Sequence, residues 1–95
     1  MKQRFAATGR EGGKGLLVTQ TPILLPDLGA SRVVFSLWHV QVGDRVTEGD
    51  RVAEVLIPGA TFDVPAPVSG TLMERNVQPN DPLAPGAVLG VIQEE

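Results

Sequence analysis

The sequence contains no cysteine and no tyrosine, and its 95 residues include only one histidine and one tryptophan. The absence of cysteine excludes disulfides, thiolate nucleophiles and thiolate metal sites together. A single histidine, His39, leaves no histidine cluster for a metal, so we expect neither a metal site nor a catalytic role there. A chain of this length forms one small domain, with no room for a catalytic domain beside its core. We therefore expect no catalytic residues and a protein that is not an enzyme.

Basic side chains are few and are unevenly placed. Residues 1–21 hold four Lys or Arg against one Glu, whereas residues 22–95 hold four Arg against ten carboxylates. A nucleic-acid surface needs clustered Lys and Arg with aromatic residues for stacking, and the acidic part offers neither. No run approaches the roughly 18 apolar residues of a membrane span, and the first residues lack the apolar stretch of a secretory signal. We expect a cytoplasmic protein without a nucleic-acid or membrane partner.

Short β-prone runs separated by turn residues make up the rest of the chain. Eight prolines and eleven glycines lie between the apolar runs rather than inside helical periods, which argues against helices. Residues 1–21, rich in Gly and charge up to Lys14, are predicted as a flexible N-terminal extension whose end can add an edge strand. The folded domain is expected over residues 22–95. Its predicted strands are Ile23–Leu25, Val33–Val40, Arg51–Ile57, Ala60–Val64, Gly70–Val77 and Val88–Gln93.

An internal repeat relates the two halves of this region. A shift of 37 residues, without a gap, places Val40–Asp44 over Val77–Asp81 and Gly49 over Gly86. Gly43 then lies over Asn80, and these are the residue types that most readily accept a positive φ. Each half alone would expose its apolar face, so the two halves must bury their faces against each other. The repeat predicts an all-β, pseudo-twofold flattened barrel or sandwich.

Two details of side-chain placement follow from the strand and turn assignments. Strict alternation in the second run puts Val33, Phe35 and Leu37 on one face, and Trp38 is expected to pack in or beside the core. Three carboxylates flank predicted turns and are expected to bond the turn backbone: Asp44, Asp50 and Asp81.

Three motifs follow one another at the spacing of a known family. Pro26–Gly29 is similar to a Pro-x-Leu-Gly opening, Trp38–Asp44 to Trp-x-Val-x-x-Gly-Asp, and Val64–Gly70 to the stretch after a modified hairpin. Together they resemble the lipoyl domains of the acyltransferase (E2) components of 2-oxo acid dehydrogenase complexes, within the wider group of lipoyl- and biotinyl-attachment domains. The resemblance covers Pro22 to Ile92. It implies a flattened eight-stranded barrel-sandwich hybrid with a carrier lysine, bearing lipoyl or biotin, at the tip of the central hairpin.

The hairpin tip departs from that family. The resemblance implies Asp-Lys-Ala at the tip, whereas the same register here gives Pro58, Gly59 and Ala60, so Gly59 stands at the lysine position. No lysine occurs anywhere from Gly15 to Glu95. Pro followed by Gly is typical of the two central positions of a type II turn, which indicates a structural role. We therefore expect a vacant carrier position, no cofactor-binding residue and no cofactor.

Three functions remain open. The leading interpretation is a non-catalytic lipoyl-like domain without an attachment lysine, acting as a structural or protein-interaction module with a protein partner. The alternative is a companion or subunit domain of an E2-type 2-oxo acid dehydrogenase complex that relies on carriers elsewhere, and this rests on fold analogy. An efflux-type adaptor is the third, but those adaptors split the halves with a long helical hairpin, and only Pro58 and Gly59 stand at that point here.

Overall fold

The computed structural model of the chain describes residues 3–6 and 17–95. Within these residues it contains strands joined by turns and loops, and it contains no helix. The strands are β1 (Gln3–Ala6), β2 (Leu17–Leu24), β3 (Val33–Trp38), β4 (Arg45–Val46), β5 (Arg51–Ile57), β6 (Ala60–Pro65), β7 (Gly70–Arg75), β8 (Pro82–Leu83) and β9 (Val88–Glu94). The prediction of an all-β domain is confirmed.

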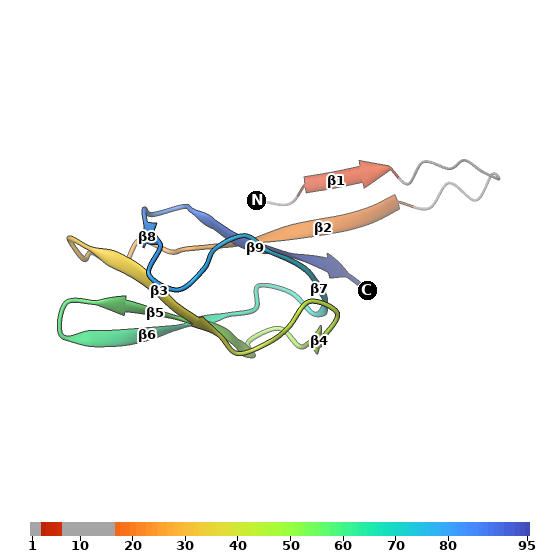
Figure 1. Cartoon of the computed structure of the whole chain (residues 1–95). Coiled ribbons are helices and arrows are strands. Elements are labelled where there is room, and N and C mark those ends of the chain that lie inside the picture. Colours follow the sequence, from red (N-terminus) through yellow and green to blue (C-terminus); the bar gives the residue numbers. More distant parts are fainter. Residues whose placement is uncertain (1–2, 7–16) are drawn as a thin grey trace.

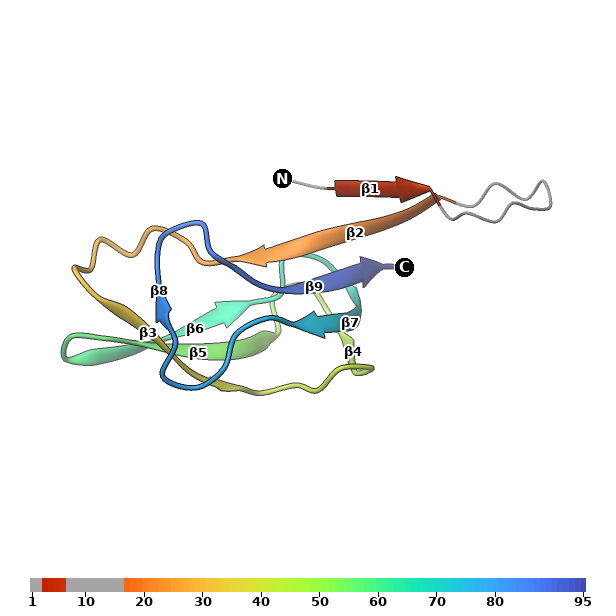
Figure 2. The same ribbon diagram turned by 45° about the horizontal axis from the view of Figure 1, so that its top comes forward.

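The strands form two antiparallel sheets that lie face to face (Figure 1). One sheet has the order β1-β2-β9-β7-β4 and the other has the order β6-β5-β3-β8. The β5–β6 hairpin projects from one end of the molecule, whereas the C-terminus lies at the opposite end (Figure 2). Strands β2 to β9 are the eight strands of the expected flattened barrel-sandwich, and the two sheets stay separate rather than closing into one barrel.

Strand β2 runs across the predicted boundary between extension and domain. It pairs with β9 from Gln20 opposite Gln93 to Leu24 opposite Val88, and β1 pairs along its other edge. Residues 1–2 and 7–16 of the predicted extension lie outside the described part of the chain. The boundary at residue 21 and the flexibility of the extension therefore stay predictions.

The internal repeat is a repeat of backbone geometry as well as of sequence. The pairing register shifts between Phe35 and Leu37 in β3, and it shifts again between Leu72 and Glu74 in β7, which are 37 positions further along. These β-bulges place one extra residue in each strand and bend the strand locally. The matching irregularities confirm the pseudo-twofold relation of the halves.

The repeat changes its offset before β3. The buried Ile23 and Leu25 of the first half match the buried Val64 and Ala66 of the second at a shift of 41 rather than 37. Four additional residues therefore lie in the loop that precedes β3, residues 26–32, compared with residues 67–69 of the second half. This loop includes the Pro26–Gly29 motif, which has no counterpart of equal length in the second half.

The core is made from equivalent positions of both halves. Phe35 matches Leu72, Val52 matches Leu89, and each of these four side chains is fully buried. Burial of one such side chain stabilises the fold by roughly 1.5–3 kcal/mol. The whole buried apolar set is Ile23, Leu25, Val33, Phe35, Val46, Val52, Ala53, Val55, Val64, Ala66, Leu72, Leu89 and Ile92.

The alternation predicted for β3 is wrong after Phe35. The bulge at Ser36 reverses the faces, so the Leu37 side chain is 40% exposed while Trp38 packs against the core. The Trp38 ring lies 5.3 Å from the Phe35 ring, and its indole Nε1 donates a hydrogen bond to the Val77 carbonyl at 3.1 Å. The expectation that Trp38 packs beside the core is confirmed.

Candidate functional site

The tip of the β5–β6 hairpin is a tight two-residue loop. Ile57 pairs with Ala60, so only Pro58 and Gly59 stand outside the ladder. Gly59 has a φ of +78°, the left-handed region that glycine enters without the steric cost of a Cβ. The predicted turn, with Pro before a positive-φ Gly, is therefore present at the end of the molecule that lies opposite the C-terminus (Figure 1).

Space around the tip is open. A Cβ built on Gly59 would meet no heavy atom within 4 Å, and Pro58, Gly59 and Ala60 are all exposed. A side chain at position 59 would therefore reach solvent freely, although it would be strained by the backbone angle. The hairpin exposes position 59 to solvent as a carrier turn would, but Gly59 has no side-chain functional group.

An apolar hollow lies next to the tip. It has a volume of about 330 Å³ and is lined by Arg32, Val34, Leu56, Ile57 and Pro58. The Leu56 side chain, on the outward face of β5, is 39% exposed. The hollow connects the turn with the outer face of β3 and β5, so the tip and the sheet beside it form one continuous surface.

The three turn carboxylates behave as the sequence predicts. Asp44 Oδ2 accepts the backbone N–H of Gln41 at 2.8 Å, and Asp50 Oδ2 accepts that of Thr47 at 2.8 Å. Asp81 Oδ2 accepts the N–H of Gln78 at 2.9 Å. Because each carboxylate closes its own turn, all three have a structural role.

His39 was treated from the sequence as a lone strand residue, but the fold brings two acidic side chains to it. Its Nε2 lies 3.4 Å from Oδ1 of Asp63, and Glu54 completes a group whose ligand atoms lie within 4.8 Å of one another. Part of this group was readable from the sequence: a two-residue turn at Pro58 and Gly59 places Glu54 directly opposite Asp63.

Comparison with known proteins matches most of the domain. A family profile described as "Biotin-requiring enzyme" matches residues 21–92. The chain is 41% identical over 69 residues to the "Lipoamide acyltransferase component of branched-chain alpha-keto acid dehydrogenase complex" of Pseudomonas aeruginosa, covering 70% of this chain and 16% of that protein. It is 28% identical over 69 residues to the "Dihydrolipoyllysine-residue acetyltransferase component of acetoin cleaving system" of Bacillus subtilis, covering 70% and 17%. The chain thus spans less than a fifth of these relatives' length, and the resemblance to lipoyl domains is confirmed.

One expectation is overturned by these matches. We expected no cofactor, but the matching profile is described by a biotin requirement, and the relatives' names contain lipoamide and dihydrolipoyllysine. The chain therefore belongs to a family whose members are described by such cofactors, and the expectation is wrong. The expectation rested on the residue type at one turn position. The matches instead concern the scaffold that presents this turn, and that scaffold is of the carrier type.

The tip residues themselves do not fit an amide-linked prosthetic group. Such a bond needs a primary amine, and neither Pro58 nor Gly59 supplies one. Residues 17–95 contain no lysine at all. Among residues 3–6 and 17–95, which form strands and loops, no membrane-spanning helix is found.

Proposed function

The chain belongs to the Biotin_lipoyl family, and from this premise we propose that it works as a non-catalytic protein-recognition domain of the lipoyl type, with no attachment lysine at its tip. One observation carries the proposal: a complete carrier scaffold presents Pro58 and Gly59 where an amine is needed, beside a largely apolar hollow. What the scaffold still offers at this end is a surface for another protein.

The surface beside the tip has the character of a contact site. Val34 and Leu56 bring apolar atoms to the outer face of the sheet, Ile57 lines the hollow beside the tip while packing against the core, and Arg32 adds a positive charge. Apolar side chains grouped on a small domain with a charged residue at the rim are typical of protein-binding surfaces. We propose that a partner protein covers this group.

We also propose that the domain has no catalytic activity of its own and that it acts in the cytoplasm. The absence of cysteine supports both parts, because it removes the thiolate nucleophile and suits a reducing compartment. The hydroxyl of Ser36 donates a hydrogen bond to Glu54 at 2.9 Å, which gives it a structural use.

The second candidate function is a companion domain within a 2-oxo acid dehydrogenase assembly. The names of the relatives favour it, since both the branched-chain component and the acetoin component are acyltransferases of larger systems. In this case the partner would be a subunit of such a complex, and carriers on other domains would transfer the acyl groups.

The experiment is an NMR titration of the ¹⁵N-labelled chain with purified subunits of 2-oxo acid dehydrogenase complexes from the same organism. We expect shifts at Val34, Leu56 and Ile57, and we expect Leu56→Ser to weaken binding by about tenfold, or about 1.4 kcal/mol. The matched control is Val88→Ser, because Val88 is similarly exposed, at 45%, but belongs to the other sheet.

Three outcomes would contradict these proposals. Shifts confined to β2, β9 and β7 would place the contact on the wrong sheet and remove the recognition role of the tip. Absence of binding to every subunit would remove the second candidate. Turnover by the isolated domain in acyl-transfer assays would contradict the non-catalytic role.

A further inference from the structure

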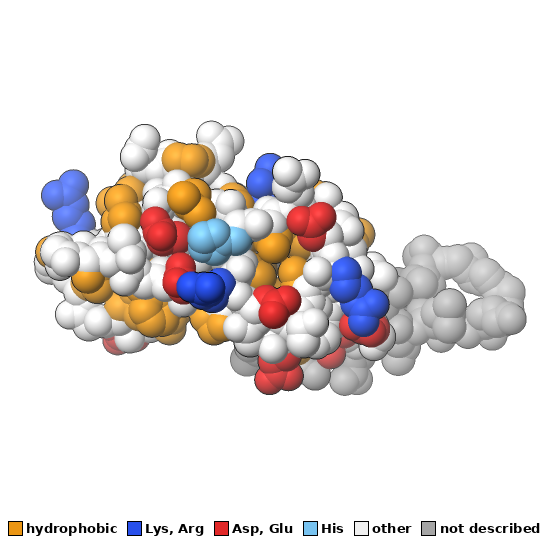
Figure 3. Space-filling view, turned by 90° about the horizontal axis from the view of Figure 1, so that it is seen from below, with side chains coloured by type: hydrophobic (Ala, Val, Ile, Leu, Met, Phe, Trp, Pro, Cys, Tyr) orange, Lys and Arg blue, Asp and Glu red, His pale blue; other side chains and the backbone are white. Residues whose placement is uncertain are grey.

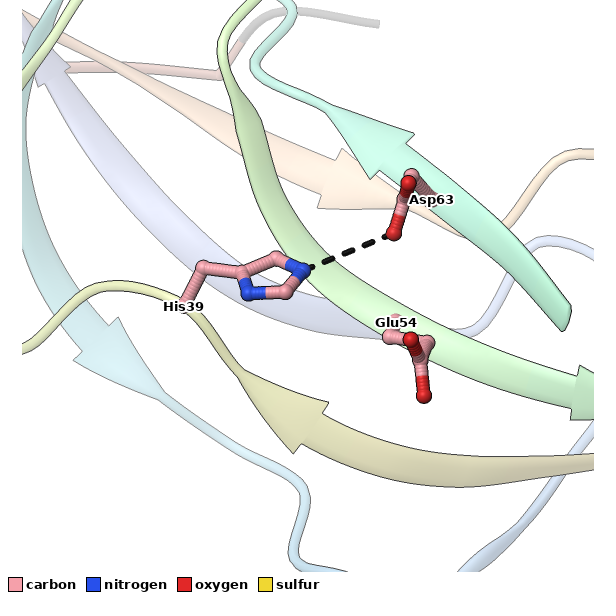
Figure 4. A group of neighbouring side chains, drawn as sticks. All are labelled: His39, Glu54 and Asp63. Carbon is pink, nitrogen blue, oxygen red and sulfur yellow. Dashed lines mark hydrogen bonds and ion pairs between the residues drawn. The ribbon is translucent and has the colours of Figure 1, made fainter.

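Three possible metal ligands meet on the outer face of the β6-β5-β3-β8 sheet (Figure 4). His39 directly follows β3, Glu54 lies in β5 and Asp63 lies in β6. The imidazole points toward the Asp63 carboxylate, and Glu54 lies beside both (Figure 4). One ligand atom from each residue lies within 4.8 Å of the others. A small movement of the side chains would let all three atoms contact one ion.

The two carboxylates face each other across the strand ladder. Glu54 and Asp63 are direct partners in the β5–β6 pairing, and like charges in that relation destabilise a sheet. Partners outside the cluster compensate weakly: the Ser36 hydroxyl that donates to Glu54 is uncharged, and Arg51 Nη1 lies 3.4 Å from Asp63 Oδ2 with the Arg51 side chain 74% exposed. Exposed ion pairs of this kind contribute little to stability. The repulsion is therefore only partly offset by side chains.

The fold does not require these three residues. The pseudo-twofold relation places Asn76 at the position of His39 and Val91 at the position of Glu54. Pro22 takes the position of Asp63, and Pro22 pairs with Val91 just as Asp63 pairs with Glu54. The β2–β9 ladder thus repeats the pairing of β5 with β6 without an ionisable group at these positions, so the cluster goes beyond what the architecture needs.

The cluster is accessible from solvent. It borders an open hollow of about 580 Å³ whose wall includes His39, Glu54 and Asp63. The imidazole, the only one in the chain, is visible at the surface with acidic and basic side chains beside it (Figure 3). A hydrated ion can enter this hollow and keep water on the side that faces away from the protein.

We propose that His39, Glu54 and Asp63 form a binding site for a divalent transition-metal ion of the zinc class. One imidazole nitrogen and two carboxylate oxygens suit Zn²⁺, whereas Mg²⁺ and Ca²⁺ prefer oxygen ligands alone. Water completes the coordination. The cation would neutralise the facing carboxylates, and Ser36, which donates to Glu54, would orient that ligand. The expectation of no metal site rested on the single histidine, whereas the fold brings two carboxylates to it.

The test uses the full chain with any affinity tag removed and Zn²⁺ as the probe. We expect one ion per chain in titration calorimetry, and we expect the ring-nitrogen resonances of His39 to shift on addition of Zn²⁺. These signals need no assignment, since the chain has one histidine. Zn²⁺ should bind more tightly than Mg²⁺.

Variants identify the ligands. His39→Asn and Asp63→Asn should each weaken Zn²⁺ binding by more than about tenfold, since even indirect supports of metal sites cost 10–100-fold. Arg51→Gln should tighten binding, because it removes a cation that competes for Asp63. The control is Glu74→Gln, an exposed carboxylate on β7 near Asn76, which should leave the affinity within about twofold.

Clear results would overturn the proposal. A His39 ring spectrum unchanged at saturating Zn²⁺ would exclude the site in the unmodified chain, even if a variant failed to fold. Binding that His39→Asn and Asp63→Asn leave unaltered would place the ion elsewhere, and weaker binding in Arg51→Gln would contradict the predicted competition.

Discussion

Gly43 and Asn80 occupy equivalent turns in the two halves, and each turn is hydrogen-bonded to the other half. The φ angles are 98° for Gly43 and 76° for Asn80. The Gly43 N–H donates to the Leu72 carbonyl at 2.8 Å, and the Asn80 N–H donates to the Phe35 carbonyl at 2.8 Å. The pseudo-twofold axis therefore relates a pair of exchanged bonds, which tie each turn to a core strand of the other half.

The first prediction concerns the positive φ of Asn80. Asn80→Ala should lower the free energy of unfolding by about 1–2 kcal/mol, because the left-handed region costs alanine about that much, whereas asparagine enters it more readily. Asn80→Gly should be close to neutral, since it restores the residue found at the equivalent position 43. Urea denaturation of both variants is the measurement. Equal losses for Ala and Gly would show that the Asn side chain, and not the backbone angle, matters.

The second prediction concerns the turn carboxylates. Asp44→Ala and Asp81→Ala should each cost about 0.5–1.5 kcal/mol, because each removes one side-chain-to-backbone hydrogen bond. Asp44→Asn keeps an acceptor oxygen and should cost less than Asp44→Ala. Thermal unfolding of the three variants checks this order. A loss for Asn as large as that for Ala would assign the effect to charge.

The third prediction concerns the close approach of backbone at Gly90. A Cβ at this position would overlap the carbonyl oxygen of Glu74 and would lie 3.0 Å from the Trp38 ring. Gly90→Ala should therefore cost at least about 3 kcal/mol, the upper end of the usual cost of overpacking. Its control is Ala53→Gly at the equivalent position, which should cost only about 1–2 kcal/mol. Chemical denaturation compares the two, and a mild effect of Gly90→Ala would show that β7 can move.

The fourth prediction concerns the exposed turn. The double variant Pro58→Asp with Gly59→Lys should accept a lipoyl group from a lipoate ligase, because the hairpin already holds position 59 in open solvent. The positive φ should cost about 1–2 kcal/mol of stability. Intact-mass measurement checks the modification. Pro58→Asp with Gly59→Arg is the control, since it carries a cation without a primary amine. If the folded lysine variant stays unmodified, features beyond the tip prevent recognition.

Local chemistry made much of the fold predictable. The Pro58–Gly59 turn, the turn carboxylates and the run Arg51–Ile57 were assigned from sequence, and the last has the same bounds as β5. Within the predicted domain, residues 22–95, two short strands, β4 and β8, were missed. Each holds only two residues, Arg45–Val46 and Pro82–Leu83, and such a pair forms a strand only because a neighbouring strand supplies its hydrogen bonds.

Some features of the candidate site and its sheet could likewise be predicted from the sequence, and others could not. The missing amine at position 59 was visible in the sequence, because it depends on residue type alone. The exposure of the Leu37 side chain was not visible in the sequence. It depends on the bulge at Ser36, which arises from the pairing of β3 with β5 and reverses which side chains face the core.

The amino-acid sequence alone thus determined where the chain turns, that its two halves repeat, and that the hairpin tip has no primary amine. The reason is that turn preferences and covalent chemistry act over a few residues. Only the tertiary structure decided that His39 lies beside Glu54 and Asp63, and that Arg32 lies beside Leu56 at the tip. Those neighbours come from separate segments, and their meeting depends on how strands pair and bend around a shared core.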